Sequence, residues 1–99
     1  MPFLIVATDK PDSLALRQQT RPEHLAYLTE NVDKLLLAGA RWTDDGETAI
    51  GSVLVVDVET REEAEAFAAA DPFSQAGLFA DVEVTTYRVA FLDKTNRLA

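Results

Sequence analysis

The chain has 99 residues, of which 47% are hydrophobic and 26% charged, and its formal net charge is −8. This length predicts one domain over residues 1–99, and the apolar content excludes an intrinsically disordered chain. The negative charge argues against a nucleic-acid partner, because phosphate backbones are bound through clustered Lys and Arg.

The sequence also argues against a membrane, a metal and a cofactor. No apolar run approaches the roughly 20 residues of a membrane span, and the Phe3–Ala7 run is too short for a signal peptide and has no basic residue before it. One histidine and no cysteine do not make a usual zinc site, and the four glycines are too scattered for a phosphate-binding loop. We expect a cytoplasmic protein without these groups.

The first elements are a strand and a loop. Residues 3–8 form a continuous apolar run rich in strand formers, which predicts a strand in the centre of a sheet. Residues 9–19 begin with turn-forming side chains and are mostly polar. They predict a long loop with at most one helical turn.

The first helix is expected to begin after Thr20. Thr20 and Glu23 have the spacing of a capping box, and Pro22 between them needs no backbone donor in a first turn. Apolar residues then recur at helical spacing as far as Ala38, and Gly39 is a typical residue to end a helix.

The later elements complete a β-α-β-β-α-β order. They are a short strand at 40–43, a turn at 44–47, a strand at 50–58, a helix from the capping residue Thr60 to about Ala70, a turn or short helix at 74–79, and a strand at 82–91. This order predicts an α+β, ferredoxin-like fold, an antiparallel sheet with both helices on one face. The other face needs a cover, which predicts a homodimer.

His24 is the first candidate for chemistry. It is the only histidine, and with cysteine absent no other side-chain type in the chain has an ordinary pKa near neutrality. We place it in the first turn of the first helix, at the border of the apolar stripe. A structural hydrogen bond is the alternative role.

Asp71 is the second candidate, because a carboxylate at the end of a helix faces the negative end of the helix dipole and needs a compensating contact. It can cap a short helix that begins at Pro72, and its second oxygen can still orient an imidazole. In the simplest topology, however, the start of the first helix and the end of the second lie at opposite ends of the sheet. A direct contact between Asp71 and His24 is therefore not expected from the fold alone.

Four further side chains are candidates for contact with a substrate. Arg17 and Arg21 near a helix N-terminus are suited to a carboxylate or phenolate, although both can equally be solvated surface residues. Phe73 and Trp42 can line a pocket, or fill the core or the dimer interface.

The chain resembles the YCII-related family of small α+β proteins over nearly its whole length. The segments that carry the resemblance, in order, are Asp9-Lys10-Pro11-Asp12-Ser13-Leu14, Arg17, Arg21-Pro22-Glu23-His24-Leu25, Ala38-Gly39, Ile50-Gly51-Ser52, Glu63-Ala64 and Asp71-Pro72-Phe73-Ser74-Gln75-Ala76-Gly77-Leu78-Phe79. The resemblance implies a ferredoxin-like dimer related to the dimeric α+β barrels, with a catalytic His and Asp that correspond to His24 and Asp71.

The function implied is less specific than the fold. One characterised branch of the family removes chloride from a chlorinated hydroxyhydroquinone, and that substrate is not carried over to this chain. The leading hypothesis is a cofactor-independent lyase or isomerase in which His24 moves a proton, Asp71 orients it, and Arg17 or Arg21 binds an anionic group. A non-catalytic ligand-binding or accessory dimer and a cofactorless monooxygenase are the alternatives.

Overall fold

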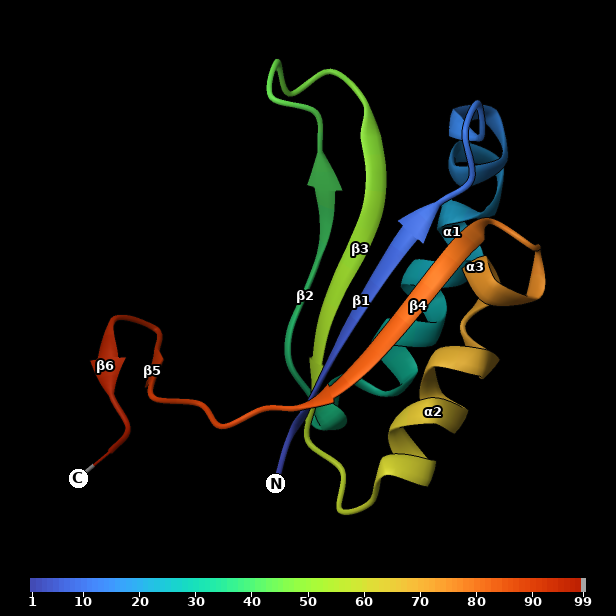
Figure 1. The fold of residues 1–99 in the computed structure, drawn as a ribbon. Coiled ribbons are helices and arrows are strands. Elements are labelled where there is room, and N and C mark those ends of the chain that lie inside the picture. Colours follow the sequence, from blue (N-terminus) through green and yellow to red (C-terminus); the bar gives the residue numbers. More distant parts are fainter. Residues whose placement is uncertain (99) are drawn as a thin grey trace.

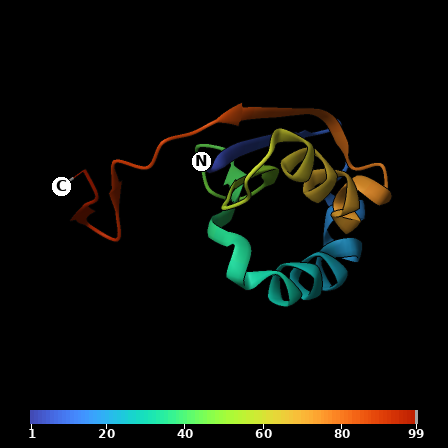
Figure 2. The same ribbon diagram turned by 90° about the horizontal axis from the view of Figure 1, so that it is seen from below.

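The computed structural model describes residues 1–98 and has a four-stranded antiparallel sheet with helices on one face (Figures 1 and 2). The elements are β1 (Phe3–Asp9), α1 (Leu14–Glu30), the 3₁₀ helix η1 (Val32–Lys34), β2 (Leu35–Trp42), β3 (Ala49–Val56), α2 (Arg61–Ala70), α3 (Pro72–Gln75), β4 (Phe79–Thr86), β5 (Phe91–Leu92) and β6 (Thr95–Asn96). The strand order β2-β3-β1-β4 is that of a ferredoxin-like fold, which confirms the predicted class. Within residues 1–98 no helix is long and apolar enough to cross a membrane.

The core lies between the sheet and α2. Phe3 and Ile5 of β1 alternate with residues of the opposite face, and with Leu54 and Val56 of β3 they form a buried layer. Phe67 of α2 and two alanines of that helix pack on this layer, where small side chains allow a close approach. This packing fixes the end of α2, from which Asp71 follows.

The predicted start of the first helix was wrong. α1 begins at Leu14, the backbone N–H of Arg17 donates to the Ser13 carbonyl over 2.9 Å, and Pro22 lies in the interior of the helix. Proline has no N–H, so the carbonyl of Gln18 lacks its helical donor. Both residues are exposed, and water can take the place of that donor.

The predicted end of that helix was wrong as well. α1 ends at Glu30, where the side-chain amide of Asn31 donates to the Tyr27 carbonyl over 2.8 Å. The following residues pair with β3 instead, with Leu35 opposite Val56. The apolar residues that continued the helical spacing are therefore strand residues, because a strand partner outweighs a weak helical preference.

The second half of the chain has its predicted elements, but the bounds of two of them were wrong: the turn or short helix predicted at 74–79 is α3 at Pro72–Gln75, and the last strand also differs. Thr60 caps α2 by accepting the backbone N–H of Glu63 over 3.2 Å, and Asp71 caps α3 as expected. The last strand, predicted over 82–91, runs from Phe79 to Thr86. The chain then leaves the sheet.

Residues 87–98 form a C-terminal arm that no sequence pattern predicted. The arm contains the hairpin β5-β6 and extends past the end of the sheet, beyond the edge that β2 forms (Figures 1 and 2). In the described residues β5 and β6 pair only with each other. The arm is therefore a projection from the domain rather than part of its core.

The close approach of β3 to β1 depends on Gly51. A Cβ at this position would clash with the carbonyl oxygen of Ala7, whereas a Cβ at Gly39 on β2 meets no atom within 4 Å. We predict that Gly51→Ala lowers the free energy of unfolding by about 1–3 kcal/mol, as overpacking does, and that Gly39→Ala causes no loss. Urea denaturation of the two variants measures this; equal effects would contradict the proposed close contact.

Candidate active site

One face of α1 carries the polar residues of the site. Arg17, Arg21, His24 and Leu28 are spaced by three or four residues, so they lie along a single stripe of the helix. Arg17 and His24 are the two buried residues of α1, with 6% and 8% of their surface exposed. Buried polar side chains need hydrogen-bond partners, and both Arg17 and His24 have such partners.

His24 and Asp71 are in direct contact. The imidazole Nδ1 lies 2.8 Å from Oδ1 of Asp71, and the same oxygen accepts the backbone N–H of Phe73 over 2.9 Å. A carboxylate can only accept, so in this hydrogen bond Nδ1 carries the hydrogen. In the neutral ring the other nitrogen, Nε2, then has a free lone pair.

The expectation from topology that the two residues lie too far apart was wrong. It placed His24 in the first turn of its helix, but α1 begins at Leu14 and His24 lies near the middle. Asp71 stands between α2 and α3, and α3 packs against α1. Because α1 starts earlier than predicted, its residue His24 lies beside the C-terminal end of α2.

Phe73 fixes the plane of the imidazole. Its ring is stacked on that of His24 at a centroid distance of 4.0 Å and an interplanar angle of 15°. The guanidinium carbon of Arg17 lies 4.6 Å from the centroid of the same ring. Phe73 is fully buried and contacts both of these polar groups.

Arg17 is a buried cation rather than a solvated surface residue. Its Nε donates to Asp9 over 2.8 Å, and its Nη2 donates to the carbonyl of Gly51 and to Oγ of Ser52, each over 2.7 Å. The side chain of Asp9 is only 6% exposed, so the ion pair is largely desolvated. Two strands, β1 and β3, thus hold one arginine of α1.

Two nitrogens of this network remain available. In the described residues no hydrogen-bond partner is found for Nε2 of His24 or for Nη1 of Arg17, and no fully buried side-chain nitrogen or oxygen lacks a partner. Both atoms must therefore reach open space. A lone pair and a cationic N–H group are thus presented from the same stripe of α1.

The space they reach is a cavity of about 240 Å³ between α1 and the strands β2 and β3. It is lined by Arg17, Arg21, His24, Leu25, Leu28, Ala38, Gly39, Ala40, Ser52 and Phe73. A wider chamber of about 640 Å³ adjoins it and shares Arg17, Arg21 and Ala40. Trp42, which is 54% exposed, lines the wider chamber and is not a core residue.

The predicted site residues therefore separate into two groups. His24, Asp71, Phe73 and Arg17 form one buried network, and Arg21 is an exposed residue on the wall of the cavity. Asp9 and Ser52 were not predicted as site residues, because each resembles an ordinary turn or strand residue in the sequence. In residues 1–98 no group of three His, Cys, Asp or Glu side chains is placed to hold a metal ion.

Tyr27 lies behind the pair. Its hydroxyl donates to the carbonyl of Phe67 over 2.8 Å. Burial raises the pKa of Tyr27 above its ordinary value, and the negative charge of Asp71 raises it further. Tyr27 therefore remains neutral at neutral pH.

Comparison with known sequences gives one family. A family model described as the YCII-related domain matches residues 1–88. The protein YciI of Escherichia coli O6:H1 is 37% identical over 98 residues, which cover 92% of this chain and 100% of that protein. The chain is thus similar to small proteins of about its own length.

Two solved structures are similar to this chain in fold, one at high and one at low sequence identity. The 5-chloro-2-hydroxyhydroquinone dehydrochlorinase TftG from Burkholderia phenoliruptrix AC1100, in complex with 2,5-dihydroxybenzoquinone, has a TM-score of 0.82 at 35% identity, over 89% of this chain and 94% of that one. An antibiotic biosynthesis monooxygenase has a TM-score of 0.53 at 14% identity, over 90% and 98% of the two chains. The second likeness shows a shared fold alone.

The burial of the Arg17 ion pair gives a stability test. We predict that Arg17→Ala lowers the free energy of unfolding by about 3–5 kcal/mol, because it leaves the carboxylate of Asp9 buried without its partner. Arg21→Ala, an exposed change on the same stripe, should stay within about 0.5 kcal/mol of the parent. Similar urea midpoints for the two variants would show that the Arg17 pair is not a structural anchor.

Proposed function

The chain belongs to the YCII-related domain family, and from this membership we propose that it is a cofactor-independent enzyme that uses His24 and Asp71 for proton transfer on a small anionic substrate. The reaction class we propose is that of a lyase or an isomerase. The observation that carries the proposal is the 2.8 Å contact of a buried carboxylate with the one imidazole of the chain, whose other nitrogen is open to a cavity.

His24 acts as the base. With Nδ1–H donated to Asp71, the lone pair of Nε2 can take a proton from a substrate in the cavity, a role that contributes about 10²- to 10⁴-fold in rate. Asp71 orients the ring and stabilises the imidazolium that forms, while Phe73 prevents the ring from turning. In an isomerase the imidazolium then returns the proton at another carbon, and in a lyase it releases the proton to solvent after the leaving group has left.

Arg17 binds the anionic oxygen of the substrate. Its Nη1 faces open space while its other nitrogens are fixed, so the donor is already placed when the substrate arrives. As His24 removes a proton from carbon, negative charge moves to a conjugated oxygen, and a nearby cation stabilises it. Arg21, at the wall of the cavity, is suited to a second oxygen.

The relative TftG supports the reaction class. It is a dehydrochlorinase bound to a dihydroxybenzoquinone, a small ring that carries several oxygens. In a lyase the charge left after proton removal expels a leaving group, and in an isomerase the proton returns at another carbon. The network of this chain supplies the base and the anion site that both reactions need.

We further propose that the protein acts as a homodimer. The face of the sheet opposite the helices carries Leu4, Val6 and Val53, and Leu37 beside them is 54% exposed. An apolar sheet face of this kind is normally covered. A second copy of the chain, through a two-fold axis, is the simplest cover.

The test uses 2,5-dihydroxybenzoquinone as a probe and a His24→Gln variant. In D₂O the parent protein should accelerate exchange of the ring hydrogens for deuterium, measured by proton NMR, because the deuterated imidazolium can deliver deuterium to a ring carbon of the enol, and Nε2 can then remove the hydrogen from the same carbon, whose negative charge returns to the oxygen at the anion site. His24→Gln should lower this acceleration by about 10²- to 10⁴-fold while the melting temperature changes little. Glu23→Gln, an exposed neighbour on α1, should exchange like the parent.

Two results would count against the proposal. A His24→Gln variant that exchanges the probe as fast as the parent would remove His24 from the chemistry. Tight binding of the probe by parent and variant alike, with no exchange by either, would favour a ligand-binding module instead.

A further inference from the structure

In the C-terminal arm, residues 87–98, the hairpin β5-β6 pairs with no other strand of the described residues, and the arm joins the domain at Tyr87, whose backbone N–H donates to the Pro2 carbonyl over 2.9 Å. Phe91 pairs with Asn96 and Leu92 with Thr95, and Asp93 and Lys94 between them have φ of 52° and 62°, as a two-residue hairpin turn requires. A single two-stranded hairpin is at best marginally stable in water. The arm therefore needs a surface on which to lie.

The arm exposes the side chains that such a surface would cover. Phe91 is 65% exposed and Leu98 is 63% exposed, more than most other large hydrophobic residues of the chain. Tyr87, at the base of the arm, is 42% exposed. Three large apolar side chains in twelve residues are typical of a contact surface rather than of a solvated tail.

The charge of the arm indicates the nature of that surface. The arm carries Arg88, Lys94 and Arg97 against Asp93, a net charge of +2, in a chain whose net charge is −8. The rest of the chain therefore has a net charge of −10. A basic, apolar arm is complementary to an acidic domain with an apolar face.

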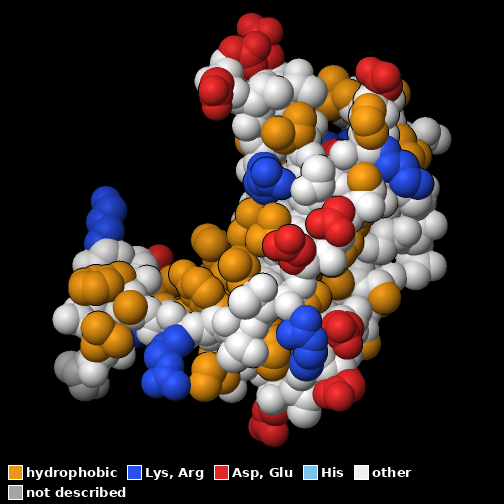
Figure 3. All heavy atoms as spheres, viewed as in Figure 1, with side chains coloured by type: hydrophobic (Ala, Val, Ile, Leu, Met, Phe, Trp, Pro, Cys, Tyr) orange, Lys and Arg blue, Asp and Glu red, His pale blue; other side chains and the backbone are white. Residues whose placement is uncertain are grey.

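The face of the sheet opposite the helices is both acidic and apolar. By register, Glu83 lies beside Val6 and Asp81 beside Thr8, so β4 places two carboxylates next to the apolar centre of that face. Figure 3 shows hydrophobic side chains gathered over the strands and continuing toward the arm. The arm of the same chain does not cover this face, because it leads away past the edge formed by β2 (Figure 1).

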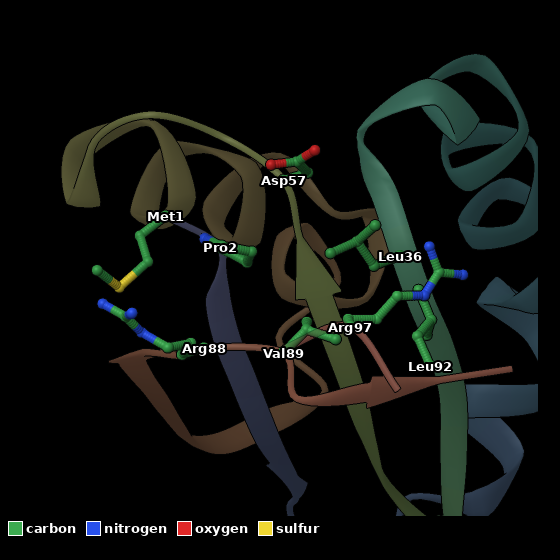
Figure 4. A pocket seen from close by; sticks show the side chains of 8 residues that line it. All are labelled: Met1, Pro2, Leu36, Asp57, Arg88, Val89, Leu92 and Arg97. Atoms are coloured by element: carbon green, nitrogen blue, oxygen red, sulfur yellow. The ribbon is translucent and has the colours of Figure 1, made fainter. Parts of the chain in front are cut away.

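A groove of about 570 Å³ marks the junction of arm and domain. Met1, Leu36 and Asp57 line it from the domain, and Val89, Leu92 and Arg97 line it from the arm (Figure 4). Leu92 is half-buried here while Phe91 points away. The hairpin thus has one side turned to its own chain and one side free for another molecule.

We propose that the arm is a clasp that docks on the open sheet face of a second copy of the chain, reciprocally about the two-fold axis. Phe91 and Leu98 cover the apolar centre of that face, and the net positive charge of the arm lies near the carboxylates of β4. The inference rests on the proposed homodimer and goes beyond it, since it assigns most of the contact to residues 87–98.

Self-association of variants tests the clasp. Sedimentation equilibrium of the full chain should give a dimer, and Phe91→Ser/Leu98→Ser should weaken dimerisation at least about 100-fold, because two large side chains lose their burial. Leu14→Ser/Ile50→Ser is the matched control. Both residues are 37% exposed and lie at the other end of the sheet, so this variant should dimerise like the parent.

Cross-linking shows which chain the arm touches. Because the protein has no cysteine, Leu98→Cys and Glu83→Cys each introduce a single thiol. When differently tagged chains of the two variants are mixed and treated with a short bis-maleimide, the product should join one tag to the other. A chain with both substitutions should give mainly products of two chains.

The outcomes separate the clasp from the dimer. A parent dimer that survives Phe91→Ser/Leu98→Ser unchanged, or cross-links formed only within a chain, would overturn the clasp and leave the homodimer in place. A monomeric parent would overturn both. Neither result depends on the exchange assay, which tests the enzymatic proposal separately.

Discussion

The buried carboxylate of Asp71 is the constraint on which the site depends. Its Oδ1 accepts two hydrogen bonds, one from the backbone of α3 and one from His24 of α1. A carboxylate that is 2% exposed is costly unless it is hydrogen-bonded, so the fold must keep both donors in place. The carboxylate oxygen that caps the start of α3 is therefore the same one that sets the orientation of the imidazole.

The buried side chain of Arg17 connects the site to the sheet. Arg17 is bound to Asp9 of β1 and to Ser52 of β3, and it contacts the ring of Phe73, which in turn stacks on His24. The imidazole is thus positioned from both the α2-α3 junction and the sheet. The proposed function requires such preorganisation, because a cation and a base must face one cavity without rearrangement when a substrate binds.

Much of the fold was predictable from local patterns. The strand at the N-terminus, the Thr60 cap and the Asp71-Pro72 helix start each have a signal in adjacent residues, and they were found. The bounds of α1 were not, because the Thr20 and Glu23 pattern imitates a cap and a helical spacing of leucines continues into β2. The pairing of His24 with Asp71 was implied by the family resemblance. The expected topology predicted no contact between them, because it placed the start of the first helix at Thr20 rather than at Leu14. The partners of Arg17 lie 8 and 35 residues away, and no local pattern reveals such contacts.

We expect Asp71 to hold the neutral imidazole of His24 with the hydrogen on Nδ1 and the lone pair of Nε2 in the cavity. Nitrogen-15 NMR of the ring tests this most directly, and the assignment is unambiguous because the chain has one histidine. In the neutral form of the ring, we expect a protonated Nδ1, an unprotonated Nε2, and loss of this preference in Asp71→Ala. A neutral ring that carries its hydrogen on Nε2 in the parent protein would contradict this role of Asp71.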